Sequence, residues 1–206
     1  MTRIKICGIT READAIVASD LGADFLGFIF VPSTPRFIEP ERAAEIVMRV
    51  RQGRPKPPQM VGVFRDSSSD YTRDIAALAG LDLVQLHGAE SDEDLQLLGI
   101  PSIKTFRVGD ALPDTTGHPS ASWLLFDTYD AHRAGGTGRP FDWSLLAPYG
   151  RQKPFLLSGG LTPDNVAAAI SLVRPDAIDV ASGVEAEPGV KNHEKLERLF
   201  ERVRRV

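Results

Sequence analysis

The chain has 206 residues, with 24 Lys or Arg against 28 Asp or Glu, and 42% of its residues are apolar. This length fits one domain with a sizeable core, and the single cysteine excludes an internal disulfide framework and a cysteine-based zinc cluster. A net charge of −4 provides no basic field for nucleic acid or a membrane surface. The longest apolar run, Phe25 to Val31, is far shorter than the ~20 residues of a membrane span, and no apolar signal segment follows the N-terminus. We therefore expect a cytoplasmic protein without nucleic-acid or membrane partners.

Eight short apolar runs along the chain predict β-strands. Several are nearly continuous in Val, Ile, Leu and Phe, which is typical of parallel strands buried on both faces. The predicted strands are Arg3–Cys7, Asp24–Phe30, Met60–Phe64, Asp82–His87, Ser102–Arg107, Trp123–Asp127, Pro154–Ser158 and Ala177–Ala181.

The segments between these runs mostly have helical periodicity. Thr10 is a candidate N-cap for the first helix, and Pro40 suits the first turn of the second. The last helix has apolar residues at helical spacing, and Asn192 is a suitable neutral cap for it. Between Val108 and Ser122 the helical pattern fails, because Gly and Pro leave room for one turn at most.

Eight alternations of strand and helix predict an α/β fold, a single (β/α)8 TIM barrel over residues 1–206 with a degenerate fifth helix. An open doubly wound sheet is the competing architecture. Against it, the chain has no G-x-G-x-x-G motif after any strand and nothing resembling a Walker A loop.

Catalytic groups of such barrels lie at the C-terminal ends of the strands, and the first candidate there is Cys7. A lone cysteine is more often a small buried apolar residue. Here, however, it ends the first strand before Gly8 and shares a strand face with Lys5. A nearby ammonium favours the thiolate, so we expect Lys5 to lower the thiol pKa and make Cys7 a proton acceptor.

The second candidate is Asp127, which ends the apolar run of the sixth strand. It could simply cap the following turn, as Asx residues often do. The alternative is a general acid whose pKa is raised by apolar surroundings. Together with Cys7 it could handle protons on two sides of one small substrate.

Glycine clusters after the last strands predict a phosphate site. Glycine lets backbone N–H groups converge on an anion, and phosphate sites of such barrels are frequently built from the loops after strands seven and eight. The candidates are Gly159 and Gly160 in the first of these loops, Ser182 and Gly183 in the second, and a further cluster at Gly135, Gly136 and Gly138 after strand six.

Arg36, in a loop after strand two held by Pro32 and Pro35, could bind a carboxylate or could be a solvated surface residue. His87 could be a core residue or a substrate contact. The other histidines, His118, His132 and His193, show no metal-ligand spacing, so we expect no metal.

At this point the chain resembles a known family, phosphoribosylanthranilate isomerase, over essentially its whole length. The segments that carry the resemblance are KICGIT, GFIFVPSTPRFI, VGVF, LVQLHG, LLFDT, GGTGRPFDW, LLSGGLTPDNV and IDVASGVEAEPGVK. That family folds as a (β/α)8 barrel with a degenerate fifth helix and acts in tryptophan biosynthesis without a cofactor.

The resemblance implies an Amadori rearrangement of N-(5′-phosphoribosyl)anthranilate to 1-(2-carboxyphenylamino)-1-deoxyribulose 5-phosphate. The family's general base falls on Cys7, its general acid on Asp127 and its carboxylate-binding arginine on Arg36. Backbone groups of Gly159, Gly160, Ser182 and Gly183 would hold the phosphate, and His87 and Asp179 would line the site by family analogy. Pro35 directly precedes Arg36, which could change how the guanidinium is aimed.

Several alternatives stay open. Indole-3-glycerol phosphate synthesis needs a lysine acid, and Lys104 is the only lysine close to a central strand end. A dual-substrate isomerase that also serves histidine biosynthesis is closer in chemistry, although such barrels are generally Asp/Asp enzymes. A non-catalytic phosphosugar-binding barrel would keep the glycines and lose the acid or the base. The charged last helix favours a monomer.

Overall fold

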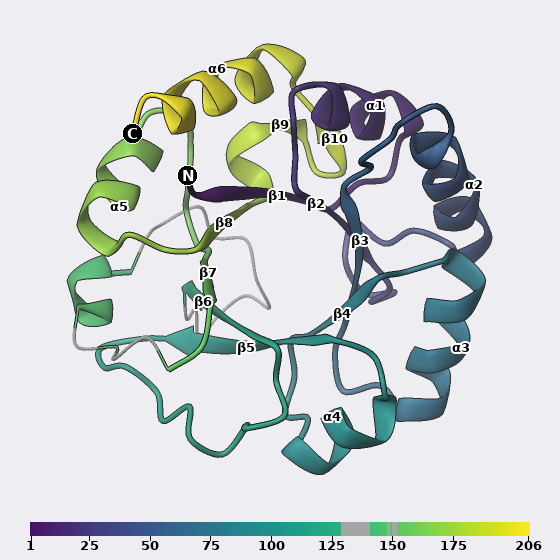
Figure 1. The fold of residues 1–206 in the computed structure, drawn as a ribbon, viewed down its shortest axis with the longest axis horizontal. Helices are drawn as coiled ribbons and strands as arrows, with labels where there is room; N and C mark the ends of the chain where they lie inside the picture. Colours follow the sequence, from purple (N-terminus) through teal and green to yellow (C-terminus); the bar gives the residue numbers. More distant parts are fainter. Residues whose placement is uncertain (129–140, 148, 150–151) are drawn as a thin grey trace.

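Eight parallel strands close into a barrel in chain order, as seen down the barrel in Figure 1. The structure is a computed structural model that describes residues 1–128, 141–147, 149 and 152–206. Every expected strand is present, with ends within two residues of the predicted ones. The strands are β1 Arg3–Cys7, β2 Phe25–Ile29, β3 Gln59–Phe64, β4 Leu83–Leu86, β5 Ser102–Val108, β6 Trp123–Thr128, β7 Phe155–Leu157 and β8 Ala177–Val180. Closure of β1 onto both β2 and β8 rules out the open sheet.

Helices surround the barrel and cover the outer face of the sheet (Figure 1). They are α1 Glu12–Asp20, α2 Pro40–Arg51, α3 Ser69–Ala79, α4 Asp92–Leu98, α5 Val166–Val173 and α6 His193–Arg204. Residues 109–122, between β5 and β6, are all described and contain no helix, which confirms the degenerate fifth helix. A 3-10 turn, η1 Trp143–Leu146, lies before β7.

Two of the expected helix starts are confirmed and one is wrong. Pro40 occupies the first turn of α2, and the Asn192 side chain accepts the Lys195 N–H at 2.9 Å to cap α6. Thr10, however, does not cap α1. The helix begins after Arg11 without a side-chain cap, because the Thr10 hydroxyl instead donates to the carbonyl of Gly189, 179 residues away.

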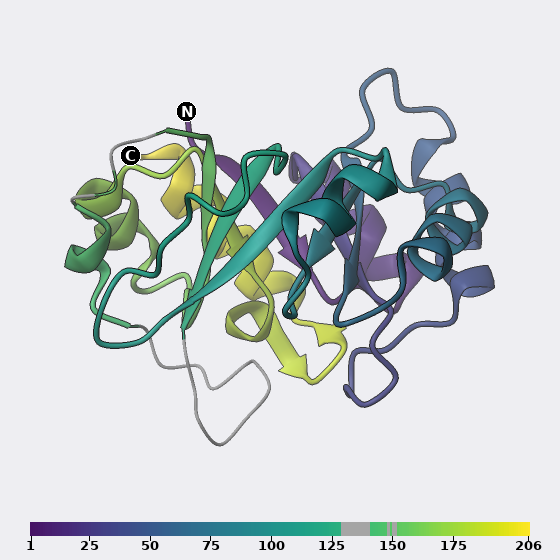
Figure 2. The same cartoon turned by 90° about the horizontal axis from the view of Figure 1, so that it is seen from below.

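Gly189 belongs to a short hairpin that the sequence reading did not anticipate. After β8 the chain forms a 3-10 turn, η2 Ser182–Val184, and then an antiparallel pair, β9 Glu185–Glu187 and β10 Val190–Lys191. In Figure 2 this hairpin projects at the lower end of the barrel, beyond the strands. It therefore reaches the end of the barrel where the C-terminal ends of the strands lie.

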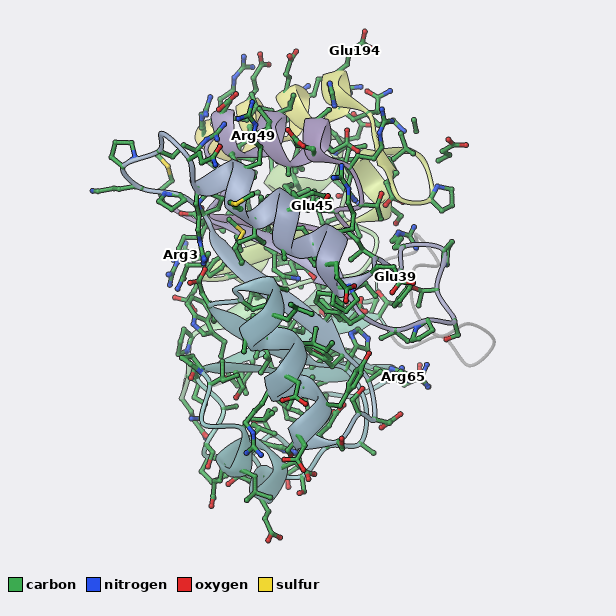
Figure 3. The ribbon with its side chains drawn as sticks, turned by 90° about the vertical axis from the view of Figure 1, so that its right-hand side faces the viewer. Arg3, Glu39, Glu45, Arg49, Arg65 and Glu194 are labelled. Atoms are coloured by element: carbon green, nitrogen blue, oxygen red, sulfur yellow. The ribbon has the colours of Figure 1, made fainter. Side chains whose placement is uncertain are left out.

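The barrel interior changes from apolar to polar along its axis. Its N-terminal half is filled by one apolar cluster, which consists of Phe25, Val61, Leu83, Ile103, Leu125, Leu156 and Ala177. The Arg3 guanidinium lies 4.3 Å from the centre of the Trp123 ring at this end. In Figure 3 Arg3, at the start of β1, lies on the left side of the molecule and Arg65, directly after β3, lies on the right side. The two residues therefore mark the N-terminal and C-terminal ends of the barrel strands. Within the described part of the chain, no helix is long and apolar enough to cross a membrane.

Candidate active site

A cavity of about 330 Å³ opens at the C-terminal ends of the barrel strands. Most of the residues singled out from the sequence line it, although they are scattered along the chain. Those that line it are Cys7, Arg36, His87, Asp127, Gly159, Gly160, Asp179 and Ser182. Gly183 does not line it; a Cβ built there would come within 1.9 Å of the Leu161 carbonyl oxygen, so this glycine permits close backbone packing behind the site. The Gly135–Gly138 cluster and His132 lie outside the described residues.

A buried polar layer forms the floor of the cavity. Lys5 is completely buried, and its Nζ donates to Gln85 Oε1 at 2.7 Å and to Asp179 Oδ1 at 2.9 Å. Burial acts to lower the pKa of Lys5, but its interactions with Asp179 and Cys7 outweigh burial, and the net pKa is raised. The ammonium is therefore a permanent positive charge below the substrate-binding space.

Cys7 lies directly above this layer on the same strand face as Lys5, as its spacing predicted. The expected lowering of its pKa is wrong. Burial raises the pKa of the thiol, and the opposing effects of the Lys5 and Lys191 ammonium groups do not overcome this desolvation. The sulfur is therefore a protonated thiol at neutral pH, and its thiolate is a strong base when it forms.

Asp127 faces the same space from the end of β6. Burial raises the pKa of its carboxyl to about 6, helped by the negative charge of Asp179. The Thr128 N–H donates to Asp127 Oδ1 at 2.8 Å and opposes that shift. The raised pKa is the one expected of a general acid, and the hydrogen bond to Thr128 shows that the residue also orders its own turn.

His87 is a neutral partner of this carboxyl. Its Nε2 atom lies 3.6 Å from Asp127 Oδ2, and its Nδ1 atom lies 3.5 Å from Gln85 Nε2. Burial and the charges of Arg107 and Lys5 lower the pKa of His87 to about 4. The imidazole is therefore uncharged at neutral pH and contributes a polar, uncharged wall to the cavity.

The loop after β7 is shaped by glycines in the left-handed region. Gly159 has φ +88° and Gly160 has φ +66°. A Cβ on Gly159 would come within 2.1 Å of Thr128 Oγ1, so no larger residue fits without moving β6. Ser182 approaches from the first residue of η2, so the loops after β7 and β8 meet at one side of the cavity. This arrangement suits an anion such as phosphate.

Arg36 lies at the loop after β2 and is not a solvated surface residue. Its Nη2 and Nε atoms donate to the Glu185 carboxylate at 2.6 and 2.9 Å, and its side chain is 16% exposed. Its aliphatic stem crosses Gly8, where a Cβ would approach Arg36 Cδ within 2.8 Å. Despite the preceding Pro35, the guanidinium is aimed firmly at the hairpin and reaches the cavity wall.

Lys104 is excluded as a catalytic acid. Its Nζ donates to Glu90 Oε2 at 2.8 Å and to the carbonyl of Gly88 at 2.9 Å, and it does not line the cavity. Among the residues that the structure describes, no group of three or more His, Cys, Asp or Glu side chains is placed to hold a metal ion.

Several functional positions were missed from the sequence. Gln85 could have been found, because a polar residue interrupts an apolar strand on its inward face. Gly27 had no such signal; its missing side chain leaves room for the Cys7 sulfur and the Lys5 ammonium. Glu185 and Lys191 were missed because the hairpin that carries them is too short to show periodicity.

Comparison with known proteins identifies the family of this chain. The family model of N-(5′-phosphoribosyl)anthranilate (PRA) isomerase matches residues 4–202. The chain belongs to this family. A curated relative from Citrifermentans bemidjiense, N-(5′-phosphoribosyl)anthranilate isomerase, is 43% identical over 100% of this chain and 98% of its own.

Solved structures of the family extend this agreement to the fold. The phosphoribosyl anthranilate isomerase from Thermus thermophilus has a TM-score of 0.89 and 38% identity, covering 99% of each chain. A second phosphoribosyl anthranilate isomerase, solved with reduced 1-(o-carboxyphenylamino)-1-deoxyribulose 5-phosphate, has a TM-score of 0.83 and 37% identity and covers 100% of each chain. The resemblance seen in the sequence is thus confirmed, whereas the roles of individual residues stay predictions.

Proposed function

We propose that this chain converts N-(5′-phosphoribosyl)anthranilate to 1-(2-carboxyphenylamino)-1-deoxyribulose 5-phosphate, an aldose–ketose isomerisation of tryptophan biosynthesis. The observation that carries the proposal is the pairing of Cys7 with Asp127, a carboxyl whose pKa is raised to about 6, in one cavity. The family supports the same reaction. The ring opening and the isomerisation that follows need only proton donors and acceptors, and the side chains of this cavity supply both.

The proposed mechanism uses the two groups in sequence. Protonated Asp127 gives its proton to the ring oxygen of the ribose, the C1′–O bond breaks, and the nitrogen lone pair forms a C1′=N Schiff base. The Cys7 thiolate then takes the proton from C2′, and the electron pair of that bond moves to neutralise the iminium, giving an enolamine. Tautomerisation of the enolamine, with a proton gained at C1′ and one lost from the 2′-hydroxyl, yields the ketone.

Two anionic ends of the substrate fix its orientation across the cavity. The phosphate would lie against the loops after β7 and β8, on backbone groups of Gly159, Gly160 and Ser182, with Gly183 allowing the close packing behind them. The anthranilate carboxylate would meet Arg36 at the loop after β2. His87 and Asp179, which contact the acid and the buried lysine, would line the reacting sugar.

Turnover of phosphoribosylanthranilate by wild type, Cys7→Ser and Asp127→Asn, followed by anthranilate fluorescence, tests the proposal. We expect wild type to be active and both variants to lose nearly all turnover. Asp127→Asn should keep the affinity for the reduced product analogue within about tenfold, ~1.4 kcal/mol. Near-normal turnover by Asp127→Asn would place the acid elsewhere and leave Asp127 as a turn residue.

The same assay separates the competing functions. Binding of the product analogue by a wild-type protein that shows no turnover would instead indicate a phosphosugar-binding barrel. Turnover of the aminoimidazole carboxamide ribonucleotide of histidine biosynthesis would indicate a dual-substrate isomerase.

We further propose that residues 1–206 act as one barrel domain in a cytoplasmic monomer. The outward face of α6 supports the monomer, because its side chains there are mostly charged and exposed, including Arg198 and Glu201, and Arg205 follows directly after the helix. Light scattering at micromolar concentration tests this: a mass near 22.5 kDa is expected, and twice that mass would contradict it.

A further inference from the structure

Three parts of the site converge on one buried ammonium group, that of Lys191. This residue is 4% exposed, and its Nζ donates to the Cys7 carbonyl at 2.5 Å, the Ala181 carbonyl at 3.3 Å and Glu185 Oε1 at 3.0 Å. Cys7 carries the proposed base, Ala181 directly precedes Ser182 of the phosphate loop, and Glu185 holds Arg36. The mechanism above makes no use of this lysine.

The hairpin keeps Lys191 and Glu185 in place. The two residues are paired across β9 and β10, and the Gly189 N–H also donates to Glu185 Oε1 at 3.3 Å. The backbone N–H of Lys191 donates to the buried Asp14 carboxylate at 3.0 Å, which ties β10 to α1. Lys191 therefore has a fixed geometry, and its charge cannot turn away toward water.

The charges of the cluster have a consequence for Arg36. Arg36 alone would be neutralised by its ion pair with Glu185, because the two side chains share 2.6 and 2.9 Å hydrogen bonds. Lys191 contributes a second positive charge to the same carboxylate, so the group of three carries a net charge of +1. Glu185 uses the Nε–Nη2 edge of the guanidinium, and among the described contacts none uses Nη1. The Nη1–Nη2 edge is therefore open to a ligand carboxylate.

We propose that Lys191 is a positioning residue for substrate specificity: it neutralises Glu185 so that Arg36, held in place by that carboxylate, keeps its positive charge for the carboxylate of the substrate. The proposal rests on the proposed function, in which Arg36 binds the anthranilate carboxylate. In this proposal Glu185 orients the guanidinium of Arg36, and Lys191 supplies the positive charge that balances the Glu185 carboxylate.

The chain offers a matched control in Lys104. This lysine is also buried, at 3% exposed, and also pairs with a buried glutamate, Glu90, at 2.8 Å. It lies outside the cavity and does not contact Arg36. A purely structural role for buried lysines predicts that Lys104→Met and Lys191→Met have the same consequences.

The experiment measures the carboxylate preference of each variant. Affinities are determined for reduced 1-(o-carboxyphenylamino)-1-deoxyribulose 5-phosphate and for its counterpart without the carboxyl group, and their ratio is compared between proteins of verified fold by circular dichroism. We expect Lys191→Met to lower this preference at least tenfold and Lys104→Met to leave it unchanged. The double variant Lys191→Met/Glu185→Gln, whose cluster returns to a net charge of +1, should regain most of the preference.

The outcomes are distinguishable. An unchanged preference in Lys191→Met, or failure of the double variant to recover it, would overturn the charge-balancing role of Lys191. An unchanged preference in Arg36→Met would instead overturn the assignment of Arg36 in the proposed function. If Lys191→Met does not fold, the double variant answers the question, because it removes the unpaired carboxylate and leaves a glutamine amide oxygen that can still accept a hydrogen bond from Arg36. Its net charge of +1 predicts a retained preference, and loss of that preference contradicts the proposal.

Discussion

The sulfur of Cys7 occupies the space that a side chain on Gly27 would need. The two residues are paired in the register of β1 and β2, and a Cβ on Gly27 would come within 2.8 Å of Cys7 Sγ. The same Cβ would lie 3.2 Å from the Lys5 ammonium. The second strand thus leaves out a side chain so that the first can place a thiol and an ammonium at the floor of the cavity.

Gly27→Ala tests this relationship. We expect the added methyl group to displace the thiol and lower kcat/KM by about 100-fold, the usual cost of a 1 Å misplacement of a reacting group. Steady-state kinetics give the change. Gly62→Ala is the control, because its Cβ would meet Leu81 on the outer face of the sheet and should lower stability while leaving kcat unchanged. Equal kinetics for Gly27→Ala and wild type would show that the thiol is not placed by this contact.

The barrel itself was predictable from sequence because its strands are short, nearly continuous apolar runs whose ends are marked by Gly and polar residues. Cys7, Asp127 and the β7 and β8 glycines followed from strand ends alone, since parallel strands bring those ends to one side. The hairpin was not predictable, because β10 has two residues, which are too few for a periodic signal. The residues that the hairpin contacts, Thr10 and Cys7, also lie more than 170 positions earlier in the chain. The direction of the Cys7 pKa shift was not predictable either. The alternation of side chains along β1 shows that Lys5 is a neighbour of Cys7, but it does not show that burial raises the thiol pKa by more than the Lys5 charge lowers it.

The pH dependence of kcat/KM should reflect both proton-transfer groups. The reaction needs protonated Asp127, whose pKa is about 6, and Cys7 thiolate, whose pKa is raised. Below pH 6 the thiolate fraction rises tenfold per pH unit while Asp127 stays protonated, so kcat/KM rises. Between the two pKa values the gain in thiolate offsets the loss of protonated acid, so kcat/KM is level, and above the thiol pKa it falls.

The acid limb of this profile should therefore belong to Asp127 and not to the thiol. The residual activity of Asp127→Asn, measured over the same range, should keep rising with pH up to the thiol pKa. The phosphate of the substrate also titrates near pH ~6, but its limb would be identical in both proteins. An unchanged acid limb in Asp127→Asn would assign that limb to the substrate.

The same carboxyl should lower stability at neutral and alkaline pH. Its folded pKa of about 6 is higher than the ~3.9 of an unfolded aspartate, so the folded state binds the proton more tightly. The resulting stabilisation is fully present below pH ~3.9 and is lost as the pH rises through 6. A shift of about two units corresponds to roughly 2–3 kcal/mol.

Asp127→Asn removes this titration, so we expect its free energy of unfolding, relative to wild type, to increase by about 2 kcal/mol between pH 4 and pH 8. Urea denaturation of both proteins at the two pH values measures it. A difference between Asp127→Asn and wild type that does not vary with pH would contradict the raised pKa.

Arg36→Met should raise KM far more than it lowers kcat. The guanidinium lies at the end of the substrate away from the carbons that exchange protons, so it binds ground state and transition state about equally. Loss of such an ion pair costs about 2–4 kcal/mol, which corresponds to a rise in KM of roughly 30- to 800-fold. The variant should fold, because Glu185 keeps its ion pair with Lys191 at 3.0 Å.

Arg65→Met is the control, because it removes a positive charge from the same cavity without touching Glu185. If direct contact with the carboxylate outweighs the overall positive potential of the cavity, this variant should raise KM less than about threefold. A substrate without the carboxylate should bind wild type and Arg36→Met alike; if it still distinguishes them, Arg36 acts on another part of the substrate.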